Sequence, residues 1–213
     1  DVRGRWETYV IAVVDSPMPG VEKALVVAGS DRRGAAYGLF EISRTIGVSP
    51  WIWWADSRPE KREELFIDPG AKVYGPPSVK YRGIFINDED FGIHPWAAKT
   101  LDPETGDIGP GTYARVFELL LRLRANHLWP AMHLHTIPFN TYEANKQVAD
   151  DYAIVMGSSH IEPMLRNSFP YAEWDREGGG EWNYFTNREA IYDFWERRII
   201  ANIGSVGQPR DLD

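Results

Sequence analysis

The chain has 213 residues, of which 43% are hydrophobic and 25% charged. These proportions are ordinary for a globular protein and exclude a disordered tail, a collagen and a coiled coil, and the length suits one large domain or two small ones. A net charge of −8 without a basic stripe argues against nucleic acid or an anionic membrane as partner, and no apolar run approaches the length of a membrane span.

The sequence of the first part of the chain predicts strands. Apolar segments over Trp6–Val14 and Val21–Ala28 predict two of them, and residues 15–20 between them have the composition of a turn. A further edge strand is predicted near Leu65–Ile67.

A helix follows the second strand. Ser30 or Asp31 is placed to cap its first turn, and Gly47 is placed to end it. Four apolar residues with helical spacing predict its buried face: Ala35, Leu39, Ile42 and Ile46. The preceding glycines resemble half of a phosphate-binding loop, but the Lys and Ser/Thr of that motif are absent, so close packing of strand and helix explains them.

A domain boundary is predicted where residues 68–80 hold three prolines and two glycines. This gives an N-terminal α/β domain over residues 1–77 and a second domain over residues 78–213. The first carries 10 basic and 11 acidic residues and the second 13 and 20, so the negative charge belongs almost wholly to the second.

The second domain alternates strands and helices. Strands are predicted over Tyr81–Asn87, His127–Ala131 and Ile154–Gly157, and helices over Thr112–Ala125, over Glu143–Ala153 and after the capping box Thr186–Glu189. This order predicts a parallel sheet, either a barrel or a doubly wound sheet. The loops that follow the strands are long, at roughly 24 and 28 residues, which indicates chemistry at the carboxyl ends of the strands.

Acidic residues cluster directly after the first of these strands. Asn87 is followed by Asp88, Glu89 and Asp90, and neighbouring carboxylates repel one another. Such a cluster suits a general acid, a general base or a metal site. The alternative is an acidic loop in which one carboxylate caps nearby amides.

Histidines surround the second and third strands. His133 and His135 would lie on one side of an extended segment, and His160 or Asp90 could complete a zinc site. We favour hydrogen bonding to substrate or backbone over a metal. His160 and Glu162 suit recognition of hydroxyl groups or support of a catalytic group, with a plain polar loop as the alternative.

Tryptophan is unusually common. The chain has nine Trp, ten Tyr and nine Phe, and no cysteine, which excludes disulfides and thiolate metal sites. Trp51, Trp53 and Trp54 suit packing between the two parts of the chain, or alternatively a carbohydrate-binding surface.

Five motifs, in order along nearly the whole chain, resemble those of one enzyme family. They are GSDRRGAAYG at residues 29–38, IGVSPW with WWAD at residues 46–56, YRGIFINDED at residues 81–90, NHLWPAMH at residues 126–133, and SSHIEPM at residues 158–164. The first two resemble the N-terminal domain of glycoside hydrolase family 115, the xylan α-1,2-glucuronidases. The other three resemble the first three strands of its barrel.

The resemblance implies an N-terminal α/β domain followed by a (β/α)₈ barrel. It implies inverting hydrolysis of α-1,2-linked glucuronic acid, or its 4-O-methyl ether, from xylan, without a metal or an organic cofactor. The site it implies has Asp90 as a catalytic residue and Asp88, Glu89 and His160 at the substrate. By position, we add Asn87, His133 and Glu162 to the substrate-binding residues.

The departure from the family is one of extent, because a barrel needs eight βα units and about three are present. We therefore expect a fragment with an incomplete (β/α)₈ TIM barrel, inactive alone, with glucuronoxylan as the substrate of the full-length protein. We also expect a secreted or periplasmic location, and leave open a homodimer of the full-length protein. The alternatives from the residues alone are a metal-dependent hydrolase that uses His133, His135 and His160, and a non-catalytic carbohydrate-binding module.

Overall fold

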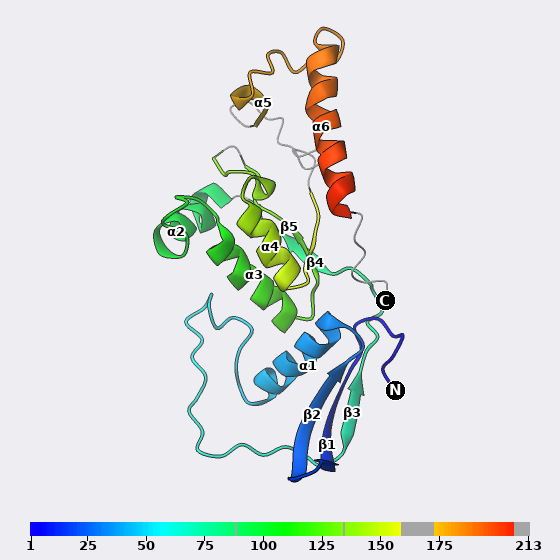
Figure 1. Cartoon of the computed structure of the whole chain (residues 1–213). Helices are drawn as coiled ribbons and strands as arrows, with labels where there is room; N and C mark the ends of the chain where they lie inside the picture. Colours follow the sequence, from blue (N-terminus) through cyan, green and yellow to red (C-terminus); the bar gives the residue numbers. More distant parts are fainter. Residues whose placement is uncertain (88, 134, 159–172, 207–213) are drawn as a thin grey trace. The chain divides into compact units, whose positions relative to one another are not determined.

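The computed structural model describes residues 1–87, 89–133, 135–158 and 173–206 (Figure 1). The chain divides into two compact units, which we describe separately. Unit 1 comprises Asp1–Gly83 and Arg115–Asn126, and unit 2 comprises Ile84–Ala114 and His127–Asp213. These compact units are a different division of the chain from the domains predicted from the sequence. The domain boundary after residue 77 stays a prediction. Within the described residues, no helix is both long enough and apolar enough to cross a membrane.

Unit 1 contains a three-stranded antiparallel sheet. Its strands are β1 (Tyr9–Met18), β2 (Val21–Gly29) and β3 (Ala71–Tyr74), in the order β2-β1-β3. The predicted strand over Trp6–Val14 therefore starts and ends later. The turn is shorter than predicted, because the β1–β2 pairing continues to Met18 opposite Val21 after a register shift.

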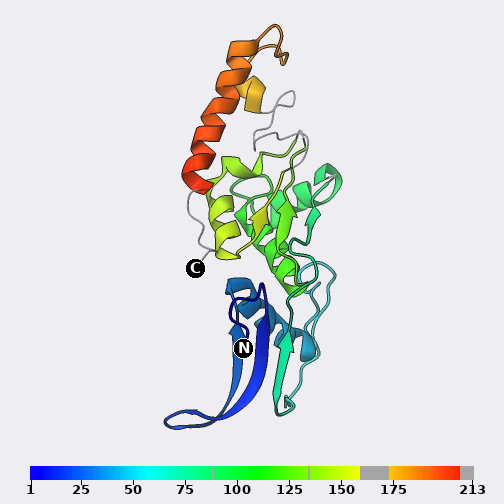
Figure 2. The same ribbon diagram turned by 90° about the vertical axis from the view of Figure 1, so that its right-hand side faces the viewer.

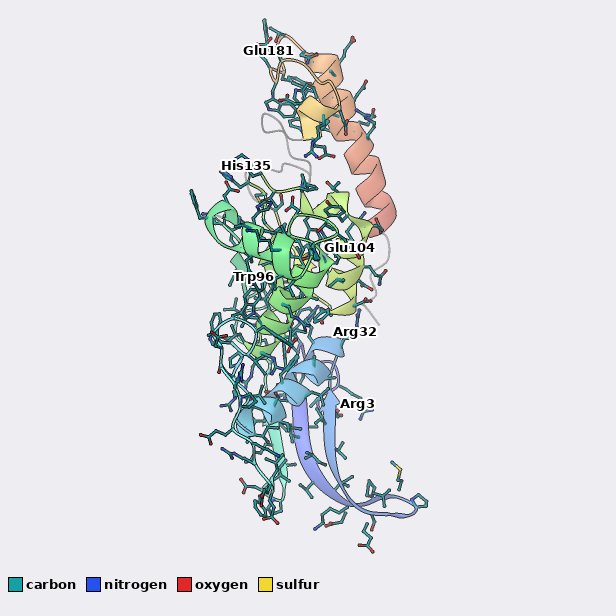
Figure 3. The ribbon with its side chains drawn as sticks, turned by 90° about the vertical axis from the view of Figure 1, so that its left-hand side faces the viewer. Arg3, Arg32, Trp96, Glu104, His135 and Glu181 are labelled. Atoms are coloured by element: carbon teal, nitrogen blue, oxygen red, sulfur yellow. The ribbon has the colours of Figure 1, made fainter. Side chains whose placement is uncertain are left out.

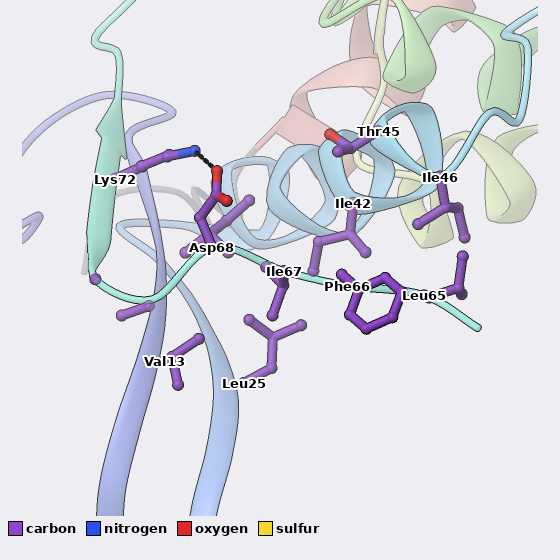
Figure 4. Close-up of a pocket in the computed structure, with 13 residues that line it drawn as sticks. Val13, Leu25, Ile42, Thr45, Ile46, Leu65, Phe66, Ile67, Asp68 and Lys72 are labelled. Carbon is purple, nitrogen blue, oxygen red and sulfur yellow. Dashed lines mark hydrogen bonds and ion pairs between the residues drawn. The ribbon is translucent and has the colours of Figure 1, made fainter.

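The edge strand predicted near Leu65–Ile67 is not the second partner of β1 in this sheet. β3 takes that place, and its Tyr74 ring stacks on Tyr9 with centroids 4.9 Å apart. Instead, Leu65, Phe66 and Ile67 line an apolar pocket of about 250 Å³ between the sheet and the helix of unit 1 (Figure 4).

Helix α1 (Arg32–Thr45) begins and ends as predicted. Asp31 is its N-cap and accepts a hydrogen bond from the Gly34 amide at 2.7 Å. Gly47 has a φ of +97°, a conformation that favours glycine and terminates the helix.

The predicted buried face of α1 is wrong at Leu39, whereas Ala35, Ile42 and Ile46 are half-buried. Leu39 is 62% exposed, and the buried residues are Arg33, Gly34, Tyr37, Gly38 and Glu41. Small residues occupy the buried face because the helix lies very close to the sheet. A Cβ at Gly38 would come within 2.4 Å of Val27 Cγ1 on the sheet. The helix thus packs closely through its glycines.

Two substitutions in α1 should separate burial from helix propensity. Gly38→Ala is expected to lower the free energy of unfolding by about 1–3 kcal/mol, since overpacking against β2 outweighs alanine's better helix propensity. Leu39→Ala, the matched control on the exposed face, is expected to change it by less than about 0.5 kcal/mol. Urea unfolding followed by tryptophan fluorescence measures both. A larger loss for Leu39→Ala would contradict the observed orientation.

A buried ionic cluster ties together distant parts of unit 1. Glu7 is 2% exposed. Its carboxylate accepts hydrogen bonds from Arg33 Nε at 2.6 Å, Arg82 Nη2 at 2.5 Å and Asn126 Nδ2 at 2.7 Å. We call these four residues the Glu7 cluster. Burial, followed by the negative charge of Glu7, raises the pKa of the adjacent Tyr37.

The second sheet confirms the predicted parallel arrangement with shorter strands. Its strands are β4 (Gly83–Phe85), β5 (His127–Trp129) and β6 (Val155–Met156), in the order β4-β5-β6, and β5 pairs with β6 in parallel. The Ile86 amide bonds to the Trp129 carbonyl at 3.0 Å just beyond the end of β4. The carboxyl ends of β4 and β5 therefore lie side by side.

The helices of the second part include two short ones that the sequence did not predict, α2 (Ile93–Thr100) and α5 (Glu173–Arg176). α2 lies in the long loop after β4, preceded by a 3₁₀ turn, η1 (Glu89–Phe91). The others are α3 (Pro110–Arg122), a second 3₁₀ turn η2 (Phe139–Thr141), α4 (Glu143–Asp151) and α6 (Arg188–Val206) (Figure 2). On α3, Arg122 forms an ion pair with Glu118, one helical turn earlier, at 2.8 Å.

The end of α3 differs from the prediction. The helix was predicted to run to Ala125, but it stops at Arg122, and Arg124 adopts a positive φ of +58°. Asn126 is completely buried, and its side chain joins the Glu7 cluster.

Part of the aromatic excess forms core in unit 2. Ile191 and Phe194 of α6 are buried, and Trp174 of α5 packs against Phe194 with ring centroids 5.2 Å apart. Trp182 contacts both rings edge-on. These rings serve packing rather than an open sugar-binding surface.

Candidate active site

The candidate site lies at the carboxyl ends of β4 and β5 in unit 2. Asp90 belongs to η1, directly after β4, and His133 follows β5. Their side chains are in direct contact through His133 Nδ1 and Asp90 Oδ2. Two residues that are 43 positions apart in the sequence are thus joined at one edge of the sheet, where parallel strands gather their following loops.

The Asp90 carboxylate is partly withdrawn from solvent. Its side chain is 17% exposed, against 44% for His133. Its second oxygen, Oδ1, is buried and has no hydrogen-bond partner among the described residues. A buried acceptor without a partner is costly, so this oxygen is available for a substrate hydroxyl, a water or a proton.

His133 and His135 lie close together, but with different exposure. Their ring centroids are 6.1 Å apart with an interplanar angle of 51°, and His135 is exposed (Figure 3). In the part of the chain that the structure describes, no three His, Asp or Glu side chains gather as a metal site would require. His160, the third ligand of the metal alternative, lies outside that part.

Aromatic rings line the sheet beside this pair. Trp129 is 40% exposed and meets Phe85 edge-on at 5.6 Å. Gly157 permits the packing, because a Cβ there would come within 2.4 Å of the Trp129 ring and 2.7 Å of His127. Burial lowers the pKa of His127, so the neutral imidazole is favoured there.

Two buried aspartates that the sequence analysis missed shape the loops around the site. Asp107 is 3% exposed, accepts hydrogen bonds from the Ile108 and Ile137 amides at 2.5 and 2.7 Å, and lies 3.6 Å from His94 Nε2. It therefore anchors the loop that follows His135. An aspartate in a polar turn gives no local signal of a partner 30 residues away.

The other missed residue, Asp102, organises the start of α3. Its carboxylate accepts from the amides of Gly109, Gly111 and Thr112 at 3.1, 2.8 and 2.9 Å, and from the Thr112 hydroxyl at 2.5 Å. Both carboxylate oxygens of Asp102 accept hydrogen bonds from backbone amides or a hydroxyl group, so its role is structural.

The remaining predicted site residues fall into two groups. Asn87 is exposed at the end of β4, and the backbone of Glu89 forms part of η1. Asp88, His160 and Glu162 lie outside the described residues.

Of the tryptophans Trp51, Trp53 and Trp54, for which packing was predicted with a carbohydrate surface as the alternative, Trp53 contacts protein. Within unit 1, Trp53 Nε1 donates to Glu118 Oε2 at 2.9 Å, and the Arg115 guanidinium lies 3.8 Å from the centroid of the Trp53 ring. Trp53 therefore packs on α3, although it remains 46% exposed.

Comparison with known proteins identifies the family. The model of glycosyl hydrolase family 115 matches residues 74–206, more than half of the chain. A solved structure, BtGH115A, is 48% identical with a TM-score of 0.78. It is described as a family GH115 4-O-methyl-alpha-glucuronidase with specificity for decorated arabinogalactans.

The match has a limited extent along that neighbour. It covers 93% of this chain but 25% of the neighbour's chain, and no curated protein matches. The match to the family model includes the strands β4, β5 and β6 and the contact between Asp90 and His133 at their ends. The chain belongs to glycosyl hydrolase family 115.

Proposed function

We propose that the protein containing this chain is an α-glucuronidase, which hydrolyses the bond between α-linked glucuronic acid, or its 4-O-methyl ether, and a plant polysaccharide. The observation that carries the proposal is the 48% identity to a 4-O-methyl-alpha-glucuronidase over 93% of this chain. The acidic cluster after β4 agrees with it, because glycoside hydrolysis commonly uses a pair of carboxylates.

In this proposal the parallel strands are the first part of a (β/α)₈ barrel. Their order, β4-β5-β6, follows the sequence, as it does in such a barrel. The later strands, in the remainder of the protein, complete the barrel and supply the basic residues that a uronate requires. Residues 1–213 alone are therefore expected to be inactive.

Asp90 is the proposed catalytic carboxylate of this part of the site. His133 contacts one of its oxygens, which fixes the carboxylate, while Oδ1 is left to face the reaction. An inverting mechanism needs a second carboxyl group about 6.5–9.5 Å away, with a water on the far side of the sugar from the general acid. Asn87, Asp88, Glu89, His133, His160 and Glu162 are proposed to bind the sugar.

Two polysaccharides are plausible on chemical grounds. The family motifs suggest glucuronoxylan, whereas the solved neighbour is described as specific for decorated arabinogalactans. Both carry uronic acid side groups on a neutral backbone, so the same subsite for the uronate would serve both. Either polymer is too large to pass a cell membrane, which favours a secreted or periplasmic enzyme.

The test uses the full-length protein with each polysaccharide. Release of glucuronic acid or its 4-O-methyl ether, measured by anion-exchange chromatography, is the expected result, and proton NMR of the first product should show the β-anomer of inversion. Release from only one polymer assigns the substrate. No release from either, together with cleavage of another glycoside, would overturn the proposal.

A further inference from the structure

Two long segments carry the contact between Asp90 and His133 in unit 2. Residues 86–109 join β4 to α3 and include Asp90, and residues 130–142 join β5 to α4 and include His133. His133 is 44% exposed, and a contact between side chains that solvent reaches adds little to the ordering of long loops. A second contact between the two segments is therefore needed to keep Asp90 and His133 together.

Asp107 makes such a contact. It lies in the first segment, and its Oδ2 accepts a hydrogen bond at 2.7 Å from the amide of Ile137, in the second segment. Ile137 comes four residues after His133, and the Thr136 amide donates to the His133 carbonyl at 2.9 Å. The amide that Asp107 holds therefore lies directly after the turn that begins at His133.

The other oxygen of Asp107 faces the helix that follows Asp90. Oδ1 accepts a hydrogen bond from the Ile108 amide at 2.5 Å and lies 3.6 Å from Nε2 of His94. His94 belongs to the first turn of α2 and comes four residues after Asp90. One carboxylate thus contacts a group four residues from Asp90 and a group four residues from His133.

Asp107 is buried and firmly held. It is 3% exposed, so it does not reach a substrate and is not the second carboxyl group of the reaction. A buried carboxylate forms strong, charge-assisted hydrogen bonds with amides. The segment that bears Asp107 is fixed in turn by Asp102, which accepts from the amides of Gly109 and Gly111. Asp107 is therefore a rigid joint between the two segments.

We propose that Asp107 is a positioning residue, which acts through the contact between Asp90 and His133. By joining the segment after β4 to the segment after β5, it keeps the His133 imidazole against Oδ2 of Asp90, so that Oδ1 stays turned toward the reaction. This role rests on the proposed function, since it belongs to that same site. Loss of the Asp107 carboxylate should therefore impair catalysis beyond its effect on folding.

The test is Asp107→Asn in the full-length protein, assayed with the polysaccharide that the wild-type enzyme cleaves. Asparagine keeps the size of the side chain, but its NH₂ group replaces one of the oxygens that accept from the two amides. We expect kcat to fall by about 10–100-fold, since a misplacement of about 1 Å can cost that much, and KM to change by much less. After His133→Ala, Asp107→Asn should lower kcat by less than about a further twofold, because the group that it positions is gone.

Two measurements separate positioning from stability. Exchange of the Ile137 amide with deuterium should quicken about tenfold or more in Asp107→Asn. Glu41→Gln, the control, makes the same change to a buried carboxylate of unit 1, which pairs with Arg44 and Arg124. It should lower the unfolding midpoint and leave kcat of the folded enzyme unchanged.

Three results would each overturn the role of Asp107. They are a kcat of Asp107→Asn within about twofold of wild type, unchanged exchange at Ile137, and equal losses of kcat with and without His133, which would mark a merely structural residue. Failure of the proposed function looks different, because the wild-type protein itself then releases no glucuronic acid from either polysaccharide.

Discussion

Replacing Glu7 by alanine is expected to lower the free energy of unfolding by about 3–5 kcal/mol, the loss typical of breaking a buried ion pair from one side. The Arg33 side chain is 4% exposed and that of Arg82 is 23% exposed. Without Glu7, the Arg33 guanidinium remains buried without its carboxylate, and Asn126 loses an acceptor in a completely buried position. Urea unfolding of the 213-residue chain measures the effect.

The control for Glu7 is an exposed glutamate of the same unit. Glu60→Ala is expected to change the unfolding free energy by less than about 0.5 kcal/mol, since its side chain lies in solvent. A loss below about 1 kcal/mol for Glu7→Ala would contradict a buried ionic cluster. Glu7→Ala is also expected to lower the pKa of Tyr37, which ultraviolet titration of the phenol can follow.

Asp90→Asn in the full-length protein is expected to reduce kcat/KM for polysaccharide-linked glucuronate by about 10²–10⁴-fold, the usual contribution of a general acid or base. Asparagine keeps the size of the side chain but removes its negative charge. The unfolding midpoint should change little, so the loss lies in catalysis rather than in folding.

Two further variants interpret that result. Glu104→Gln removes an exposed carboxylate in the loop after α2 and should leave kcat/KM unchanged (Figure 3). His133→Ala removes the partner of Asp90 and is expected to cost less than Asp90→Asn. If His133→Ala costs as much, Asp90 is a positioning residue. Near-normal activity of Asp90→Asn would remove it from the site.

Local sequence patterns predicted which helices and strands form better than they predicted which side of each element is buried. The cap at Asp31, the stop at Gly47 and the three parallel strands depend on residues close in sequence, and they are present. The buried face of α1 was predicted from apolar spacing, and Leu39 on that face is exposed. Glycines allow that helix to approach the sheet, so shape rather than hydropathy decides which side is buried.

Helix α2 shows a second reason for failure. Its eight residues contain a proline at the third position and no capping side chain, so neither propensity nor capping signals it. The predicted site fared differently. Asp90 and His133 were both predicted site residues, each follows a parallel strand, and the structure brings them into contact. The loop anchors Asp102 and Asp107 had no comparable signal.

By itself, the sequence determined the alternation of strands and helices, the ends of α1 and the gathering of polar residues after parallel strands. These follow from backbone preferences and hydrophobic period, which act over a few residues. Only the tertiary structure decided which charges are buried. Glu7 meets Asn126 across 119 positions, and such a carboxylate is stable inside the protein only because folding brings distant donors to it.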